Sequence, residues 1–479
     1  MLLSKMFEDA PDIQIDGFMQ NSKNYLENSM FFCINGIEHD GHNYVNQAIK
    51  NGAICIVHTK ELETYQDDIT YIKVKDIKSV LSKAINIFYK NPSENIDLFG
   101  VTGTNGKTTI CNIITRLLSK SVNTGYMGTL GVFYNDEKLP PLLTTLDIMD
   151  NYKLLDKMIK SDVKACAMEV SSIGLVAGRV SKLDYKIAIY SNLTHDHLDY
   201  HGDFKSYINA KKILFDNLKE DAFAIMNSDD MYYRDLITDC KSKIVTYGID
   251  SKADFQAFDV KYYKDNTTFN LKVFDKQYYI ETNLVAKFNI YNLLASISAL
   301  YCYGIKIEDL IKELQTIPKI EGRMDIINEN QNFNVIVDFA HTPDGLEKVM
   351  LYAKKITKKN NRIIAVFGSA GKRDVLKRKI FGQLADKYCD LLILTEDDPR
   401  DEDVIEIAEE IATGVANINY LIIENRNLAI NQAISLANAE DTVIILGKGN
   451  EKFIYREFGK VDYDGDEIIA KNAIIELMK

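Results

Sequence analysis

One short stretch, residues 96–118, limits the fold of this chain more than any other part of it. Apolar Leu98 and Phe99 predict the end of a buried strand, and residues 110–118 carry isoleucine and leucine at helical spacing. The loop Gly103-Thr-Asn-Gly-Lys-Thr108 joins the two elements. A strand, a glycine-rich loop and a helix in this order can close backbone N–H groups around a phosphate at a helix N-terminus. The sequence therefore predicts an α/β domain built around a phosphate-binding loop.

This loop carries side-chain types that suit a nucleoside triphosphate. Lys107 would supply a positive charge for the outer phosphates, and Thr108 would supply a hydroxyl for Mg²⁺. The usual spacing has a glycine at position 101, where this chain has Val101, and the nearest glycine is Gly100. A glycine-rich turn that binds nothing is the alternative interpretation. The order of strand, loop, lysine, threonine and helix favours ATP binding.

The composition is that of a compact globular protein. A length of 479 residues is enough for about three domains, and 46% hydrophobic residues supply ample core. The formal net charge of −12 argues against nucleic acid or an acidic membrane surface as a partner. The 7 cysteines are scattered and form no CxxC pair, which is typical of free thiols in a reducing compartment. No secretory signal and no apolar run of about 18 residues is visible, so we expect a soluble cytoplasmic protein without a membrane segment.

Breaks in the hydrophobic pattern divide the chain into three expected domains. Short strands and a helix predict a small α/β domain over residues 1–95, which ends after the turn at Asn91-Pro92-Ser93. Residues 96–321 alternate strands with helices, which favours a mostly parallel sheet. Residues 322–479 form a third α/β domain that has no phosphate loop of its own.

Two apolar runs of the central domain end in polar side chains. Residues 165–172 place Glu169 and two serines at a strand end. Residues 187–201 end in a denser polar cluster, and three of the chain's 7 histidines lie between Thr194 and Gly202. Because ligands gather beyond the carboxyl ends of parallel strands, we expect Glu169 and His197 near the phosphate loop. They could hold a Mg²⁺ that bridges ATP to a second substrate. Mg²⁺ prefers oxygen ligands, so a structural histidine is the alternative for His197.

Four strands in the last third each end in a polar cluster, and such a succession predicts a binding face at a cleft shared with the central domain. The clusters are Phe339-Ala-His341-Thr-Pro-Asp344, Gly368-Ser-Ala-Gly-Lys-Arg373-Asp374, Glu396-Asp397-Asp398-Pro-Arg400 and Gly447-Lys-Gly-Asn-Glu451.

Together these motifs resemble the Mur ligase family, and in particular its MurE type, whose members add the third amino acid to UDP-N-acetylmuramoyl-dipeptide. The matching segments are Gly103–Thr108, Met168–Ser172, Asn192–Gly202, Ala210-Lys211, Gly322–Asp325, Val337–Asp344, Lys372–Asp374, Asp397–Arg400 and Gly447–Gly449. Asn21-Ser22-Lys23 stands where the family usually has Asp-Ser-Arg at its uridine site. The resemblance implies an N-terminal UDP-binding domain (1–95), a central ATP-binding domain (96–321) and a C-terminal Rossmann-like amino-acid-binding domain (322–479).

The resemblance also implies a role for individual positions. Lys107, Glu169, His197 and Lys211 would be catalytic, and Thr108, Glu169, His197 and Lys211 would hold Mg²⁺. ATP would contact Gly103, Thr104, Asn105, Gly106, Lys107, Thr108, Thr109, Asn289, Asn292, Arg323, Asp338 and His341. The muramoyl-peptide would contact Ser22, Thr144, Thr145, Ser171 and Arg179. The acceptor amino acid would contact Arg373, Asp397, Asp398, Arg400, Gly447 and Glu451. Lys211 would act as a carbamate, because a CO₂ adduct turns the amine into an anionic oxygen ligand; without the resemblance it is an ordinary solvated lysine.

The implied reaction belongs to peptidoglycan precursor synthesis. ATP would phosphorylate the terminal carboxylate of UDP-N-acetylmuramoyl-L-Ala-D-Glu, and an amine would then attack the acyl phosphate. Arg400 favours meso-diaminopimelate as that amine, because a guanidinium in a closed cleft pairs best with a second carboxylate. Asp398 replaces the family's asparagine, and its charge would favour any cationic side chain. L-lysine and meso-lanthionine are therefore open alternatives.

Three further departures bear on the substrate. Leu146, Ile173 and Asn450 replace the proline, histidine and histidine that the family usually has there. Leu146 and Ile173 lie near the expected peptide site, which leaves open a paralogue that acts on a modified precursor. A folylpolyglutamate synthase, a cyanophycin-type ligase or a non-catalytic nucleotide-binding regulator are less favoured, because the opening domain and the four catalytic side chains are all present. We expect a monomer.

Overall fold

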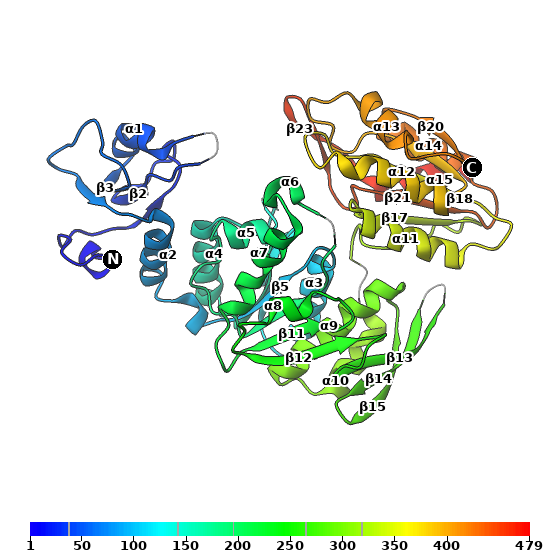
Figure 1. Ribbon diagram of the computed structural model, residues 1–479, viewed down its shortest axis with the longest axis horizontal. Coiled ribbons are helices and arrows are strands. Elements are labelled where there is room, and N and C mark those ends of the chain that lie inside the picture. The colour runs from blue at the N-terminus through cyan, green and yellow to red at the C-terminus, as the bar shows by residue number, and fades with distance from the viewer. Residues whose placement is uncertain (37–38, 141–142, 195, 264–265, 318–319) are drawn as a thin grey trace.

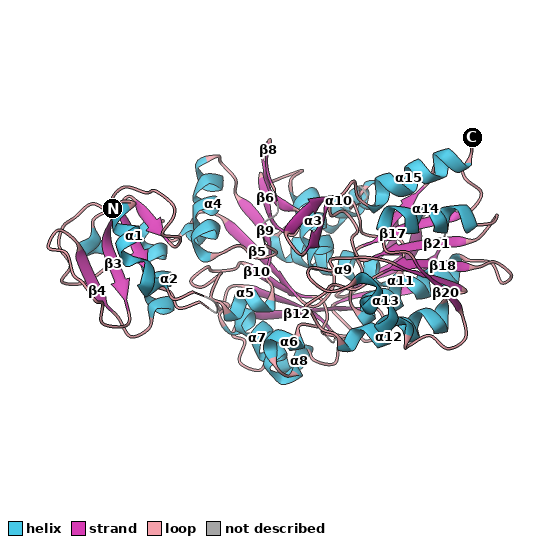
Figure 2. Ribbon diagram, turned by 90° about the horizontal axis from the view of Figure 1, so that it is seen from above, coloured by secondary structure: helices cyan, strands magenta, loops and turns pink. Residues whose placement is uncertain are grey.

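The chain forms three α/β bodies that follow one another along the long axis of the molecule (Figures 1 and 2). The computed structural model describes residues 1–36, 39–140, 143–194, 196–263, 266–317 and 320–479. The first body holds strands β1–β4, the middle body β5–β15 and the third body β16–β23. Within these described ranges no helix is long and apolar enough to cross a membrane.

The first body is a 4-stranded parallel sheet in the order β1-β2-β3-β4. Its elements are β1 (Gly17–Met19), β2 (Ser29–Phe32), α1 (Val45–Lys50), β3 (Ala53–His58), β4 (Thr70–Lys73) and α2 (Ile77–Phe88). Helix α2 packs against α4 of the middle body, so it joins the two bodies.

The middle body is organised by an 11-stranded sheet in the order β15-β14-β13-β12-β11-β10-β5-β9-β6-β7-β8. Its strands are β5 (Asp97–Thr102), β6 (Thr124–Gly128), β7 (Gly131–Tyr134), β8 (Glu137–Leu139), β9 (Ala165–Glu169), β10 (Ile187–Tyr190), β11 (Phe223–Asn227), β12 (Lys243–Gly248), β13 (Phe255–Tyr262), β14 (Thr267–Val273) and β15 (Lys276–Thr282). Its helices are α3 (Lys107–Leu118), α4 (Ile148–Lys160), α5 (Ser172–Val176), α6 (Leu198–His201), α7 (Phe204–Asp216), α8 (Tyr233–Leu236), α9 (Lys287–Tyr303) and α10 (Ile307–Glu313). Strands β6, β9, β5, β10, β11, β12 and β13 run parallel, and antiparallel strands close both edges. The predicted mostly parallel sheet is confirmed.

Strand β5 and helix α3 are the elements that the opening motif predicts. Leu98 and Phe99 are fully buried in β5, and the isoleucines of α3 are buried against the sheet and against α9. The phosphate loop therefore lies at the carboxyl end of β5, an inner strand of the sheet, and leads into α3.

The third body is a 6-stranded sheet in the order β16-β17-β21-β18-β19-β20, with helices on both faces (Figure 2). Its strands are β16 (Asp325–Ile327), β17 (Asn334–Asp338), β18 (Ile363–Phe367), β19 (Leu391–Leu394), β20 (Asn419–Ile422) and β21 (Thr442–Leu446), with the hairpin β22 (Phe453–Arg456) and β23 (Gly459–Asp462). Its helices are α11 (Pro343–Ile356), α12 (Leu376–Tyr388), α13 (Val404–Ala412), α14 (Arg426–Leu436) and α15 (Asp466–Leu477). All neighbours except β16 pair in parallel, which is the predicted Rossmann-like arrangement.

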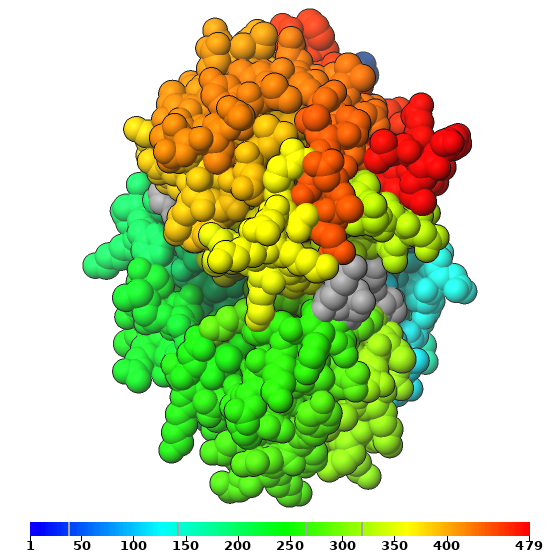
Figure 3. Space-filling view, turned by 90° about the vertical axis from the view of Figure 1, so that its right-hand side faces the viewer, coloured from blue at the N-terminus to red at the C-terminus, as the bar shows by residue number. Residues whose placement is uncertain are grey.

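The four polar clusters predicted in this body follow β17, β18, β19 and β21, which are adjacent in the sheet order. Their carboxyl ends therefore meet at one edge, as the predicted binding face requires. This edge is close to the middle body, and the space-filling view shows the yellow surface of α11 against the green surface below it (Figure 3).

Candidate active site

The phosphate loop is held open by the end of the neighbouring strand β10. The backbone N–H of Thr104 donates to the carbonyl of Asn192 at 2.8 Å, and the Ser191 hydroxyl donates to the carbonyl of Asn105 at 2.6 Å. Gly103 has a φ of +147°, and a Cβ at this position would lie 1.9 Å from the Ser191 oxygen. Val101 belongs to β5 and is fully buried, so the loop itself begins at Gly103.

Lys107 folds back over this loop. Its ammonium donates to the carbonyls of Gly103 and Thr104, both at 2.9 Å, and it forms no ion pair with a residue that the structure describes. Burial lowers the pKa of Lys107, against the opposing charge of Glu169. The positive charge is therefore held at the loop by neutral groups, which a phosphate can replace.

Glu169 ends β9 beside the loop and is only 1% exposed. Its carboxylate accepts hydrogen bonds from the hydroxyls of Thr108 (3.0 Å), Tyr126 (2.5 Å) and Thr129 (3.1 Å), and from the Thr129 backbone N–H (2.9 Å). These donors are neutral, so the negative charge is solvated by the protein without being cancelled. The expected proximity of Glu169 to the phosphate loop is confirmed by its bond to Thr108.

Lys211 lies on α7 and is 1% exposed. Its Nζ atom lies 4.5 Å from the centre of the Tyr207 ring, and it forms no hydrogen bond or ion pair with any described residue. Burial lowers the pKa of Lys211 well below its usual range, and the charge of Lys107 adds to this effect. The interpretation of Lys211 as a solvated lysine is wrong. Solvated ion pairs belong to its neighbour Lys212, which contacts Asp216 and Asp239.

The described histidines of the central cluster differ in their contacts. His197 precedes α6 with a φ of +53°, and its Nε2 atom lies 3.4 Å from a carboxylate oxygen of Asp196. Burial lowers the pKa of His197, which favours the neutral imidazole that can bind a metal. His201 instead shares a 3.0 Å hydrogen bond with Ser172. His195, the third histidine of the cluster, lies outside the described residues.

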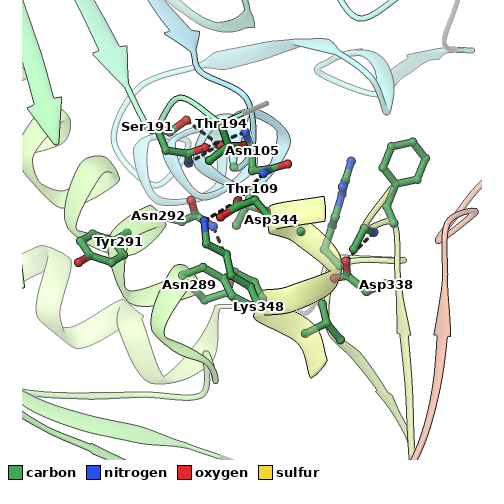
Figure 4. A pocket seen from close by; sticks show the side chains of 18 of the residues that line it. Asn105, Thr109, Ser191, Thr194, Asn289, Tyr291, Asn292, Asp338, Asp344 and Lys348 are labelled. Atoms are coloured by element: carbon green, nitrogen blue, oxygen red, sulfur yellow. Dashed lines mark hydrogen bonds and ion pairs between the residues drawn. The ribbon is translucent and has the colours of Figure 1, made fainter. Parts of the chain in front are cut away.

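A cavity of about 280 Å³ opens beside the loop, between the middle and third bodies (Figure 4). The predicted ATP residues that line it are Asn105, Gly106, Thr109, Asn289, Asn292, Arg323, Asp338 and His341. Gly103, Thr104, Lys107 and Thr108 belong to the adjoining loop and to the start of α3. The lining also includes Asp229, Tyr291, Asp344 and Lys348, which sequence reasoning did not assign.

Contacts across this cavity tie the phosphate loop to the third body. The Asn105 side chain donates to Asp344 at 2.8 Å, and Asp344 also pairs with Lys348 at 2.7 Å (Figure 4). The Arg323 guanidinium lies 4.3 Å from the Phe339 ring and reaches the Thr108 hydroxyl at 3.5 Å. The two bodies therefore share one site.

Two of the predicted ATP residues lie at the end of β17. Asp338 is its last residue, and His341 follows it in the next loop. The Asp338 carboxylate accepts from the backbone N–H groups of Met324 (2.7 Å) and Ala340 (2.8 Å), and burial raises its pKa. His341 bonds to the Phe339 carbonyl at 3.0 Å, and burial lowers its pKa to about 4. On α9, the Asn292 amide donates to the Asn289 side chain at 3.2 Å.

The residues predicted to hold the muramoyl-peptide gather in the middle body, except for Ser22. Thr145 bonds to Ser171 at 3.0 Å, Arg179 donates to the Thr145 carbonyl at 3.1 Å, and the Thr129 hydroxyl reaches Thr144 at 3.3 Å. Ser22 lies in the first body, where it donates to Gln47 at 2.9 Å.

A cavity of about 440 Å³ is lined by residues of both the first and the middle body. Lys78 lines it from the first body, and Asp147 and Arg179 line it from the middle body. Of the two departures expected near the peptide, Leu146 is a buried core residue and Ile173 is half-buried on α5. The substitution at Leu146 is therefore absorbed by packing.

Four of the predicted acceptor residues, Asp397, Asp398, Gly447 and Glu451, surround a buried lysine that sequence reasoning did not assign. Lys448 pairs with Asp398 at 2.8 Å and with Glu451 at 2.5 Å, and lies 4.0 Å from Asp397. Gly447 has a φ of +112°, and a Cβ there would lie 2.8 Å from an oxygen of Asp397. A lysine between two glycines after a buried strand was the signal available in the sequence.

The two predicted acceptor arginines are placed differently. Arg400 has a φ of +57°, a backbone conformation that costs about 1 kcal/mol for such a side chain. Its guanidinium donates to the Gly371 carbonyl at 2.5 Å and makes no ion pair with a described residue. Arg373 is exposed before α12 and forms neither a hydrogen bond nor an ion pair within the described chain. Arg400 therefore lies on the same loop as Asp397 and Asp398 of the acidic cluster, whereas Arg373 forms no hydrogen bond or ion pair with that cluster among the described residues.

Comparison with known proteins agrees with this architecture. Residues 15–89 match the model of the Mur ligase family, catalytic domain; residues 101–300 match the Mur ligase middle domain; and residues 322–449 match the Mur ligase glutamate ligase domain.

Similar proteins match over almost the whole chain. The UDP-N-acetylmuramoyl-L-alanyl-D-glutamate–2,6-diaminopimelate ligase 1 of Clostridium acetobutylicum is 36% identical, over 96% of this chain and 95% of its own. The UDP-N-acetylmuramyl-tripeptide synthetase of Borreliella afzelii is 37% identical, over 100% of this chain and 97% of its own. A solved structure of a UDP-N-acetylmuramoyl-L-alanyl-D-glutamate–2,6-diaminopimelate ligase superimposes with a TM-score of 0.71 at 29% identity, over 100% of this chain and 99% of that one. The resemblance read from the motifs is confirmed, and the chain belongs to the Mur ligase family of ATP-dependent ligases.

Proposed function

We propose that this protein adds meso-diaminopimelate to UDP-N-acetylmuramoyl-L-Ala-D-Glu, using ATP, in the synthesis of peptidoglycan precursors. The observation that carries the proposal is the junction where the phosphate loop meets the carboxyl ends of both large sheets. At this junction, ATP bound at the loop and an acceptor bound at the third body would both reach the same peptide substrate. Relatives named for this reaction support the proposal.

The three bodies divide the substrates among them in this proposal. Residues 1–95 would bind the uridine nucleotide, residues 96–321 ATP and the peptide, and residues 322–479 the amino acid. Since ATP and UDP-activated precursors are cytoplasmic compounds, we place the protein in the cytoplasm. We expect it to act as a monomer.

The residues beside the loop fit a Mg²⁺ ion. Thr108 and Glu169 offer the oxygen atoms that Mg²⁺ prefers, and His197 offers a neutral imidazole. Among the described residues no three histidine, cysteine or acidic side chains form a metal group, so a further ligand has to come from another residue type. Bound Mg²⁺ would neutralise charge on the transferred phosphoryl group.

Lys211 is the residue that can complete this set. Burial lowers the pKa of Lys211 and so favours the neutral amine, which is the form that adds CO₂. The carbamate would add a second anionic group to the carboxylate of Glu169 at this buried site, where Lys107 supplies a positive charge.

The chain's own groups then account for both chemical steps. Lys107 would stabilise the charge that develops as the peptide carboxylate attacks the terminal phosphate of ATP. Arg179 and the linked hydroxyls of Thr145 and Ser171 would hold the peptide. Once the acyl phosphate has formed, the acidic cluster around Lys448 would position the ammonium of the acceptor, whose free amine displaces phosphate.

The test measures phosphate release from ATP with UDP-N-acetylmuramoyl-L-Ala-D-Glu and four acceptors: meso-diaminopimelate, meso-lanthionine, L-lysine and ornithine. We expect the two diacids to exceed lysine and ornithine by up to about 10⁴-fold in kcat/KM, because lysine would leave the Arg400 guanidinium unpaired. Arg400→Ala should narrow this difference by lowering the rate with the diacids.

The matched control is Arg456→Ala on β22. Arg456 already pairs with Glu396 through both carboxylate oxygens, at 2.8 and 2.9 Å, so its loss should leave the ratio between acceptors unchanged. Efficient use of lysine by the unaltered protein, with diaminopimelate inert, would contradict the acceptor assignment and leave the ligase reaction intact.

A further inference from the structure

The acidic cluster of the third body is built around one lysine. Lys448 has a side chain that is 0% exposed, and its Nζ atom contacts Asp398 at 2.8 Å and Glu451 at 2.5 Å. Burial alone would lower the pKa of Lys448, but the surrounding carboxylates outweigh it and raise the pKa. A charged ammonium therefore sits permanently inside the predicted acceptor site.

Asp398 and Arg400 lie two residues apart on one loop, yet they do not pair. The same oxygen of Asp398 that meets Lys448 also accepts from the backbone N–H of Tyr455 at 2.9 Å. The Arg400 backbone N–H donates to the Tyr455 carbonyl at 3.0 Å, and its guanidinium contacts the Gly371 carbonyl. The two side chains are thus turned to different partners. The Asp398 carboxylate is paired with Lys448, whereas the Arg400 guanidinium has no counter-ion among the described residues.

We propose that Lys448 is a positioning residue that holds Asp398 away from Arg400, and thereby keeps the Arg400 guanidinium free for a second carboxylate on the acceptor. This inference rests on the proposed function. It makes Lys448 a determinant of acceptor specificity, although it would touch neither the acceptor's distal carboxylate nor ATP.

The reason is competition between carboxylates for one guanidinium. Without Lys448, Arg400 is the cation on the same loop to which Asp398 can turn, and a carboxylate–guanidinium pair is strong in a closed site. A diacid acceptor would then have to displace Asp398, whereas lysine, which has no distal carboxylate, would lose nothing at Arg400.

The experiment compares Lys448→Met with Lys448→Met/Asp398→Asn in the full-length protein. We expect the single variant to lower kcat/KM for meso-diaminopimelate by about 100-fold, the effect of blocking a charge-assisted pair. The change should appear mainly in the acceptor KM, while kcat/KM for lysine falls much less and the KM for ATP is unchanged. The double variant should recover most of the loss, because residue 398 then has no carboxylate that could occupy Arg400. Lys448→Arg, which keeps the charge, should remain close to the unaltered protein.

Two controls separate this role from packing. Thermal unfolding midpoints show which variants fold. The single variant leaves the carboxylates of Asp398 and Glu451 without Lys448, and the double variant leaves, of these two, only that of Glu451, so the two variants also differ in the number of unpaired buried charges. Equal losses with diaminopimelate and lysine, or no recovery on adding Asp398→Asn to a folded protein, would overturn the role of Lys448. If the unaltered protein uses no diamino acid at all, the proposed function fails first, and the inference falls with it.

Discussion

Replacing Lys107 with alanine is expected to abolish ATP turnover while leaving the protein folded. Among the described residues Lys107 donates to two loop carbonyls and pairs with no carboxylate, so we expect its loss to leave the fold intact. The loss of a cation that stabilises phosphoryl transfer costs about 10³-fold or more in rate. Phosphate release and the thermal unfolding midpoint measure the two effects separately.

The matched control for this variant is Lys120→Ala. Lys120 lies just after α3 and is exposed, with a surface contact to Glu313 at 3.5 Å, so we expect little change in turnover or stability. Unchanged phosphate release in Lys107→Ala would remove the ATP site from the proposal.

Lys211→Ala is expected to reduce the rate by about 10³-fold or more, because losing even the partners of metal ligands costs up to about 10²-fold. A small carboxylic acid such as formate should restore part of the activity by replacing the anionic group of the carbamate. Intact-protein mass spectrometry under CO₂, after trapping of the adduct, should show one added CO₂ in the unaltered protein and none in the variant.

The neighbouring residue provides the control. Lys212→Ala removes a lysine from the same turn of α7 that forms exposed ion pairs, and it should keep full activity. Full activity of Lys211→Ala without any added acid would show that the buried amine has no part in the reaction.

The parts of the fold and site that sequence reasoning predicted depend on local pattern. The apolar run before Gly103 and the helical spacing after Lys107 identified β5, the loop and α3, since periodicity reports directly on which face of an element is buried. The polar clusters after four strands of the third body correctly predicted that these strand ends meet at one edge, because parallel strands bring their carboxyl ends together whatever the sequence distance between them.

The parts that it did not predict depend on contacts between distant residues. Lys448 meets Asp398, which lies 50 positions earlier, and no pattern near either residue indicates that pair. The burial of Lys211 likewise depends on how α7 packs, so composition alone favoured a solvated side chain. Arg400 was predicted from the sequence as an acceptor residue, but its left-handed backbone and its lack of a counter-ion among the described residues are properties of the folded loop.

The hydrogen bond between Asn105 and Asp344 has a consequence for the affinities of the substrates. It joins the phosphate loop to the first turn of α11, so a rotation of the third body relative to the middle body has to break or reshape this contact. We therefore expect a ligand bound beside one of these two residues to change the free energy with which a second ligand binds to the other body. Such linkage is reciprocal: whatever factor ATP adds to the affinity for the amino acid, the amino acid adds to the affinity for ATP.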